Sequence, residues 1–205
     1  ADSVAAVSTG TQVTQIITSL ITGLTLGGTI LVGKYTGMRE EEKTRRSIGT
    51  TLSLFGIFSV LLMILVIGFA APILHLLQTP EEAFDLAKTY VTICGWGIPF
   101  TCGYNAVAAV LRGMGDSRHP FMFIAISSVL NVILDLVFTG WMKLGVGGAA
   151  FATAFSQMVS LVLSLRLLIK RRGEVGFVLK LSSFRPDSMY LGKMVRLGVP
   201  LAIQA

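Results

Sequence analysis

Long stretches of the chain carry almost no charged side chains, and these stretches predict its secondary structure. An uncharged apolar run longer than about 18 residues is a candidate membrane-spanning helix. The two longest runs exceed what a bilayer requires, so we expect these helices to tilt or to reach into the headgroup layer. The pattern predicts an all-α bundle of five spans, which cover residues 3–33, 47–80, 89–111, 120–142 and 144–165.

Polar side chains recur inside three of these spans at the spacing of a helix. Steps of three and four residues keep side chains on one helix face. Small polar residues often bond to their own backbone or join neighbouring helices, so the stripes also fit a purely structural role. The stripes comprise Thr11, Gln15, Thr18, Thr22, Thr25 and Thr29; Ser127 or Ser128, Asn131 and Asp135; and Thr153, Ser156 or Gln157, and Ser160.

Asp135 is the only formally charged residue of the fourth predicted span. An aspartate in hydrocarbon is energetically costly and usually marks an ion or proton path. At about 1.5 Å per residue, Asp135 and Asn131 lie about 10 and 16 Å below the outer surface, and Thr153 lies about 12 Å below it. We therefore expect these three side chains to share one site. Their carboxylate, amide and hydroxyl oxygens are hard donors that suit a small cation such as Na⁺, and the carboxylate can also carry a proton.

The composition supports a membrane location. Apolar residues make up 53% of the 205 positions and charged residues 14%, whereas a soluble domain is about one-quarter charged. Glycine occurs 22 times, often inside the apolar runs, which is typical of close helix packing in lipid. The chain is therefore predicted to be a polytopic membrane helix bundle.

The basic residues are concentrated in alternate links between the predicted spans. Of 17 Lys and Arg, all but Lys88 and Lys143 fall in residues 34–46, 112–120 and 166–196. Cytoplasmic loops of membrane proteins are enriched in these two residue types. We expect the basic links to be cytoplasmic, in a multi-pass protein of the inner or plasma membrane. The net charge of +6 then reflects topology, and no nucleic-acid partner is expected.

The sequence contains no motif for an enzyme or a transition-metal site. Cys94 and Cys102 lie eight residues apart in one predicted helix, with Pro99 between them, so a disulfide is geometrically unfavourable. His75 and His119 fall in different segments and give no metal-ligand spacing. Nucleophile-elbow, zinc-protease and Walker motifs are absent. We expect no enzymatic activity, no cofactor and no transition metal.

The loop GMGD at residues 113–116 matches the GxGD letters of intramembrane aspartyl proteases. That chemistry requires two carboxylates that lie close together and share a proton. Asp135 lies about 28 Å from Asp116 if the intervening residues are helical, so the two cannot form such a dyad. We expect a glycine-rich turn instead, with Asp116 or Ser117 capping the next helix and Pro120 near its first turn.

Three longer motifs together resemble the MATE family of multidrug and toxic compound extrusion transporters. They are AAVSTGTQ (5–12) leading to LVGKYTGMREEEKTRRSIG (31–49), AAVLRGMGDSRHP (108–120), and NVILDLVF (131–138) followed by LGVGGAAFATAFSQ (144–157). Their order and spacing cover nearly the whole chain.

The resemblance implies a fold of two six-helix lobes, twelve helices in all, of which this chain is an incomplete N-terminal lobe. Residues 1–172 are then helices two to six of the first lobe, residues 173–189 a cytoplasmic connector, and residues 190–205 the start of helix seven. The first helix, which carries a further acidic residue in some members, and the second lobe are then the missing remainder of the chain.

The resemblance also implies a function, which is secondary active antiport. Cationic or amphipathic organic compounds such as drugs and toxins leave the cell as Na⁺ or H⁺ enters. Asp135, Asn131 and Thr153 fall on positions that bind cations or change protonation in some members. Further polar residues, which we expect to line the cavity, are Asn105, Gln15, Thr11, Thr18 and Gln157.

Two other functions remain open from the sequence. A lipid-linked oligosaccharide flippase of the same superfamily shares the architecture, but we expect it to line its cavity with basic residues for phosphate. No Lys or Arg lies in the core of a predicted span, which favours the drug antiporter. A channel or a structural membrane protein is the other alternative, and it uses the polar stripes only for packing.

Overall fold

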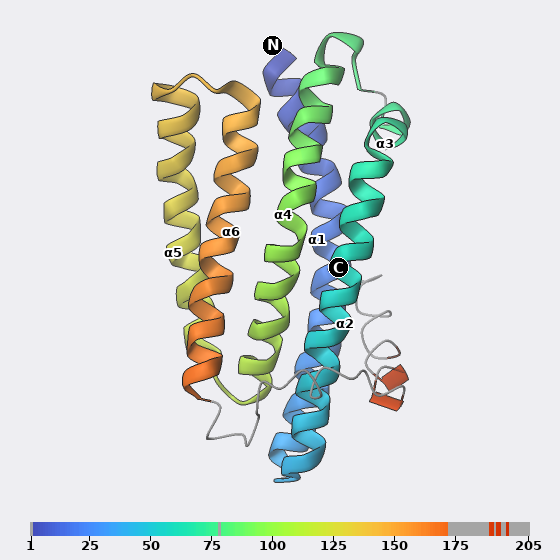
Figure 1. The fold of residues 1–205 in the computed structure, drawn as a ribbon, viewed down its shortest axis with the longest axis vertical. Coiled ribbons are helices and arrows are strands. Elements are labelled where there is room, and N and C mark those ends of the chain that lie inside the picture. The colour runs from blue at the N-terminus through green and yellow to red at the C-terminus, as the bar shows by residue number, and fades with distance from the viewer. Residues whose placement is uncertain (1, 78, 172–188, 191, 194–195, 197–205) are drawn as a thin grey trace.

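The computed structural model describes residues 2–77, 79–171, 189–190, 192–193 and 196. In this part of the chain nearly all residues are helical and none forms a strand. The elements in chain order are α1 (Asp2–Gly37), α2 (Glu41–Gly68), α3 (Ala70–Leu76), α4 (Glu81–Gly113), α5 (Arg118–Asp135), the π-helix η1 (Leu136–Trp141) and α6 (Gly145–Lys170) (Figure 1).

The five predicted runs each contain one long helix, but the second run is not a single helix as expected. α2 ends at Gly68, and the short helix α3 begins after Phe69. Pro72 lacks the N–H group that would bond to the carbonyl of Gly68, four residues earlier, and its ring clashes with that carbonyl in a continuous helix. The proline therefore divides this run into two helices.

The fourth run also departs from a regular α-helix. α5 ends at Asp135, and the chain continues directly as η1. Its π-type bonding reaches five residues back, as in the hydrogen bond from the Met142 N–H to the Val137 carbonyl oxygen at 2.8 Å. Single π-helical turns within α-helices are frequent at functional sites, and this one follows the only aspartate of the span.

The helix at the centre of the bundle is α4, which packs against α1, α2 and α6 (Figure 1). Small residues permit these close approaches. A Cβ atom at Gly113 would lie 2.7 Å from the Cβ of Val32 on α1, and one at Gly97 would lie 3.1 Å from the Cβ of Ala154 on α6. Because α5 packs mainly on α6, these two helices form a pair beside α4.

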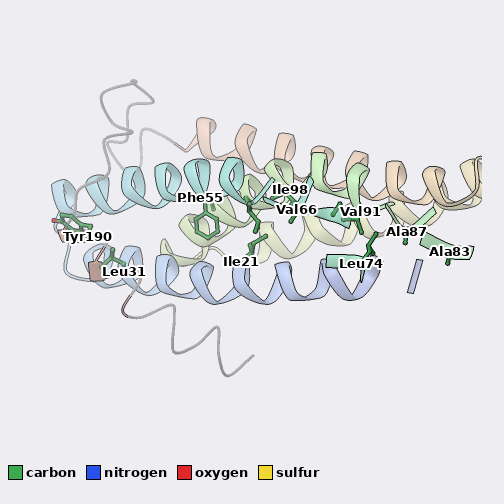
Figure 2. Packing of buried hydrophobic residues seen from close by; sticks show 14 of the residues in the cluster. Ile21, Leu31, Phe55, Val66, Leu74, Ala83, Ala87, Val91, Ile98 and Tyr190 are labelled. Carbon is green, nitrogen blue, oxygen red and sulfur yellow. The ribbon is translucent and has the colours of Figure 1, made fainter. Parts of the chain in front are cut away.

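The largest cluster of buried apolar residues lies between α1, α2 and α4 (Figure 2). Ile21 comes from α1, Phe55 and Val66 from α2, and Val91 and Ile98 from α4, and all five are almost fully buried. Because lipid tails are as apolar as these side chains, close van der Waals packing rather than the hydrophobic effect holds such helices together.

Three helical stretches are long and apolar enough to cross a membrane, judged on the described residues: α2, α5 together with η1, and α6. Large exposed apolar side chains cover their outer faces, among them Leu61 and Ile64 on α2, Val129 and Val132 on α5, and Phe151 on α6. Exposed apolar surface of this extent is typical of a region that contacts lipid or another protein surface.

The basic links of the sequence lie at one end of the bundle, here termed the basic end (Figure 1). It contains the α1–α2 turn at residues 38–40, the α4–α5 turn at residues 114–117 and the last turn of α6. The links at residues 77–80 and 142–144 lie at the opposite end. The links therefore alternate between the two ends as predicted, and the side of the membrane that each end faces stays a prediction.

The predicted connector and the predicted start of another helix, residues 173–189 and 190–205, lie almost entirely outside the described residues, so this division stays a prediction. Tyr190 is described and only 2% exposed. Its ring packs edge to face on Tyr35 near the end of α1, with the ring centroids 5.6 Å apart. The Nζ atom of Lys193 donates a hydrogen bond to the Tyr35 hydroxyl at 3.4 Å.

Candidate functional site

The polar stripes of α5 and α6 face each other. Asn131 Nδ2 donates a hydrogen bond to Thr153 Oγ1 at 3.5 Å, and Ser127 Oγ donates to the carbonyl oxygen of Ser156 at 2.7 Å. Polar groups surrounded by apolar helices bond across to a neighbouring helix because no water is available to them. Two of the three residues that were predicted to share one site, Asn131 and Thr153, are thus in contact.

Asp135 lies one helical turn beyond Asn131, at the last position of α5. Its Oδ1 atom is buried and has no hydrogen-bond partner among the described residues. The large majority of buried polar atoms in proteins have a partner, and an exception requires an explanation. A carboxylate oxygen in this position is available to a proton or a cation.

Another polar group comes from α4, and it was not predicted from the sequence. The side chain of Tyr90 shares a hydrogen bond with Thr11 of α1, contacts Cys94 one turn further along α4, and lies within electrostatic range of Asp135. The available signal was a tyrosine inside an apolar run, since a buried tyrosine hydroxyl usually finds a partner. Tyr90 thereby joins α1 and α4 to the neighbourhood of Asp135.

A cavity of about 40 Å³ lies between α1, α4 and α6. Its polar lining consists of Thr18, Thr101, Thr153 and Gln157, and the rest of the lining is mainly apolar. A space of this size holds a few water molecules at most. Thr153 lines the cavity and also bonds to Asn131, so the cavity adjoins the predicted ion site.

The polar residues of α1 differ in burial, and Thr22 is exposed and donates a hydrogen bond to the Thr18 carbonyl oxygen at 2.8 Å. Thr25 and Thr29 each donate a hydrogen bond to the backbone carbonyl oxygen four residues earlier, at 2.6 and 3.0 Å. A structural role accounts for them, because hydroxyls in helices commonly bond back to their own backbone. Thr11, Gln15 and Thr18 instead have exposed side chains, and of these Thr18 reaches the cavity.

Asn105 does not itself line the cavity and lies one helical turn from Thr101, which does. Its Nδ2 atom donates a hydrogen bond to the Thr101 carbonyl oxygen at 2.8 Å, within its own helix. Along α4, Asn105 is fifteen residues from Tyr90, which corresponds to about 22 Å of helix. The fold therefore does not bring Asn105 to the neighbourhood of Asp135.

Asp116, at the basic end, has partners for both carboxylate oxygens. Its Oδ1 atom accepts a hydrogen bond from the backbone N–H of His119 at 3.1 Å, whereas Ser117 makes no side-chain cap. Its Oδ2 atom lies 2.7 Å from His119 Nδ1 and 2.7 Å from Nη1 of Arg171, which follows α6. The prediction of a capped turn is confirmed, with Asp116 as the capping residue.

The partners of Asp116 stabilise its charged form. Burial alone would raise the pKa of this carboxyl, but the hydrogen bonds from His119 and the charges of His119 and Arg171 together outweigh burial. The pKa of Asp116 is therefore held below its usual range. As a permanent anion, Asp116 ties the α4–α5 turn to the end of α6, and it lies at the other end of α5 from Asp135.

The described residues contain no group of three or more His, Cys, Asp and Glu side chains that could hold a metal ion. Cys94 and Cys102 are both free thiols. The donors near Asp135 are a carboxylate, an amide and hydroxyls, which suit a hard cation such as Na⁺ rather than a soft transition metal.

An apolar helix bundle in which an aspartate has a buried oxygen atom without a partner and polar stripes face each other is typical of membrane proteins that move ions or solutes. Comparison with known proteins identifies the family of membrane proteins. The family model MatE matches residues 1–137, more than half of the chain, and the chain belongs to this family.

Individual relatives agree with this assignment. The chain is 33% identical to the probable multidrug resistance protein YoeA of Bacillus subtilis and 30% identical to the FAD transporter of Shewanella oneidensis. Each alignment covers 98% of this chain and 45% of the relative. A solved structure, the inward-facing conformation of a multidrug resistance MATE family transporter of the MOP superfamily, has a TM-score of 0.92 at 27% identity. The match covers 98% of this chain and 46% of the chain in the solved structure.

The chain thus spans less than half the length of these relatives. The comparisons confirm the predicted family and the predicted all-α membrane bundle. The family consists of transporters rather than enzymes, in agreement with the expected lack of enzymatic activity. With several helices that can cross a membrane, the chain is a multi-pass membrane protein.

Proposed function

We propose that the transporter to which this chain contributes exports cationic or amphipathic organic compounds in exchange for Na⁺ or H⁺. The observation that carries the proposal is the buried Oδ1 atom of Asp135, which has no hydrogen-bond partner among the described residues. It lies one helical turn from Asn131, which bonds to Thr153. A carboxylate in the membrane that lacks a fixed counter-charge is suited to bind and release a cation or proton.

Antiport through this site requires that Asp135 change its charge or its occupancy between the inward-facing and outward-facing states. The membrane potential then supplies about 2.3 kcal/mol per charge for each 100 mV. If the ion is Na⁺, Asn131 and Thr153 add neutral oxygen donors to the carboxylate. If the ion is H⁺, Asp135 alone takes it up, and its neighbours stabilise one of the two forms.

The chemistry of the exported compound is inferred from the relatives and from the site. The YoeA relative is described as a probable multidrug resistance protein. Asn131, Thr153 and Tyr90, the described side chains placed near Asp135, are neutral, so the aspartate is the charged group of the site, which favours an organic cation over an anion. We expect cation and substrate to compete for the negative charge of Asp135, so that uptake of one displaces the other.

A second candidate is transport of a compound that bears phosphate, since the FAD transporter is 30% identical to this chain. Lys and Arg are the usual protein ligands of phosphate. Among the described residues that line the cavity there is neither Lys nor Arg. The same observation disfavours a lipid-linked oligosaccharide flippase, so organic-cation export remains the better supported function.

The decisive experiment compares Asp135→Asn with Asp85→Asn in the full-length transporter reconstituted into vesicles. Asp85 is an exposed residue near the start of α4, so its variant controls for loss of one negative charge. Asparagine keeps the shape of aspartate but cannot carry its charge. We expect Asp135→Asn to insert normally and to lose ion-driven efflux of ethidium, and Asp85→Asn to transport normally.

Normal efflux by Asp135→Asn, with unchanged dependence on pH and Na⁺, would show that this aspartate only packs helices. Efflux by the wild type that proceeds equally without any ion gradient would instead support the channel alternative.

We also propose that the basic end faces the cytoplasm. The support is the alternation of links between the two ends and the concentration of Lys and Arg in those at one end. Glu41 lies at the basic end and Glu81 at the opposite end, and both are exposed. Glu81→Cys should react with a membrane-impermeant thiol reagent added to intact cells, and Glu41→Cys should not; the reverse pattern would invert the orientation.

A further inference from the structure

The chain directly after Asp135 is π-helical and is held against α6. The backbone N–H of Leu144 donates a hydrogen bond to the Phe138 carbonyl oxygen at 2.8 Å. The Phe138 ring packs edge to face on Phe151 of α6, with the ring centroids 5.7 Å apart. The Thr139 hydroxyl donates to the carbonyl oxygen of Asp135. The position of Asp135 is thus linked through η1 to α6.

Of the glycines in α6, Gly148 is the one that η1 approaches most closely. A Cβ atom at Gly148 would lie 3.0 Å from the Cβ of Leu144, just before α6, 3.0 Å from the Cβ of Phe138 and 3.3 Å from the Phe138 carbonyl carbon. These atoms belong to the main chain or are attached to it, so they cannot turn aside as the end of a flexible side chain can. At Gly147 an added Cβ would meet only the end of Ile93, at 3.8 Å, which is an ordinary contact.

The π-helical register determines where Asp135 lies around the axis of α5. An α-helix advances about 1.5 Å and turns about 100° per residue, and a π-type turn accommodates one additional residue. If the anchor at Phe138 stays on α6, loss of the π-turn would rotate Asp135 by about that angle. A shift of Phe138 that leaves the π-turn intact would also move Asp135, but by less than this rotation.

We propose that Gly148 is a positioning residue for Asp135. By admitting the backbone of Phe138, it keeps η1 in its π-helical register and keeps the half-buried carboxylate of Asp135, with its buried Oδ1 atom, one helical turn beyond Asn131. That this carboxylate then exchanges a cation or proton rests on the proposed function, whereas its placement by Gly148 does not. Among the described residues, the titratable group of α4 within electrostatic range of Asp135 is Tyr90, and α6 presents the neutral Thr153 to Asn131.

The placement can be measured without transport. In membranes that contain the full-length protein, dicyclohexylcarbodiimide, a carboxyl reagent that partitions into lipid, modifies Asp135 at a rate set by its surroundings. Peptide mass spectrometry gives that rate, and Asp135→Asn gives the background. An added Cβ at Gly148 requires its neighbours to move by a few tenths of an ångström. Because reaction rates depend steeply on geometry, we expect the labelling rate to change about threefold for Gly148→Ala. Gly147→Ala, on the same turn, should label as the wild type does.

A second pair of variants tests the same link without adding volume. Thr139→Val removes the hydroxyl that bonds to the Asp135 carbonyl oxygen, and Thr139→Ser retains it. We expect the labelling rate to change in Thr139→Val and to return to the wild-type value in Thr139→Ser. Because Thr139 is exposed, these variants remain informative if Gly148→Ala does not insert. A merely structural role of this turn would lower the melting temperature without this dependence on the hydroxyl.

The proposal is overturned if Gly148→Ala labels at the same rate as Gly147→Ala, or if Thr139→Val labels at the same rate as Thr139→Ser. Failure of the proposed function has a different signature. Normal efflux by Asp135→Asn would remove the coupling role of this carboxylate, while a labelling difference between the two alanine variants would still support its placement by Gly148.

Discussion

Two aspartates flank α5, and their surroundings are opposite. Asp116 precedes the first turn of the helix and bonds through both carboxylate oxygens, to His119 and to Arg171. Asp135 ends the helix, and its buried Oδ1 atom has no partner among the described residues. An aspartate therefore stabilises the fold at one end of α5, and the aspartate at the other end is the one that we propose exchanges a cation or proton.

The difference lies in the counter-charge. At Asp116 a guanidinium group from beyond α6 offsets the cost of burying the anion, and the ion pair is permanent because it is part of the fold. At Asp135 the described neighbours are neutral hydrogen-bonding groups, so the charged form lacks a fixed cation. A buried anion without a fixed partner favours taking up a mobile cation or a proton.

The largest effect on the folded state is expected from reversing the charges at the basic end. Asp116→Arg would place two guanidinium groups together and remove the cap of α5, and Arg171→Asp would place two carboxylates together. We expect each single variant to lose about 2 kcal/mol of stability, between the values for exposed and buried ion pairs. The double variant should recover much of this loss, because the pair is restored with its polarity exchanged.

The melting temperature of the purified full-length transporter measures this effect. Asp85→Asn provides a control that should melt as the wild type does. Losses that simply add in the double variant would show that Asp116 and Arg171 do not interact energetically.

A smaller effect is expected from the neutral partners of Asp135. Asn131→Ala and Thr153→Ala each remove one neutral group, which is worth about 1 kcal/mol, or roughly a fivefold change in ion affinity. Thr153→Ser keeps the hydroxyl and is the matched control. The Na⁺ or H⁺ concentration that gives half-maximal efflux should rise in the two alanine variants and stay near the wild-type value in the serine variant.

Alanine variants with the wild-type ion dependence would show that Asn131 and Thr153 only join α5 to α6. Complete loss of ion-driven efflux in either variant would also break the comparison, because the carboxylate would then not be the dominant ligand.

The helices could be predicted from the sequence because a long uncharged run indicates a membrane span whatever tertiary contacts the helix makes. The break at Phe69 was missed, although Pro72 carries the signal, because the run was judged by its lack of charge. The π-helix could not be foreseen, since nothing in the local sequence signals it and the residues that it approaches, such as Gly148 on α6, lie on a different element.

The site residues also differ in whether their positions follow from helix geometry or from the packing of distant helices. Asn131 and Thr153 could be assigned to one site from the sequence because the helical rise places Thr153 at a depth between Asn131 and Asp135. Arg171 was not foreseen as a partner of Asp116, because it lies 55 residues further along the chain and meets it only after folding. Tyr90 was missed for the same reason, since its relation to Asp135 depends on how α4 packs beside the α5–α6 pair.

The comparison between the two aspartates is tested most directly by ion release from the purified full-length transporter when ethidium is added. If substrate and coupling ion oppose each other's binding, substrate must expel bound H⁺ or Na⁺ by the same coupling free energy. We predict release from the wild type and from folded Asp116→Asn, and none from Asp135→Asn. Release from Asp135→Asn equal to that of the wild type, or its loss in Asp116→Asn, would contradict the assignment of exchange to Asp135 and of fold stabilisation to Asp116.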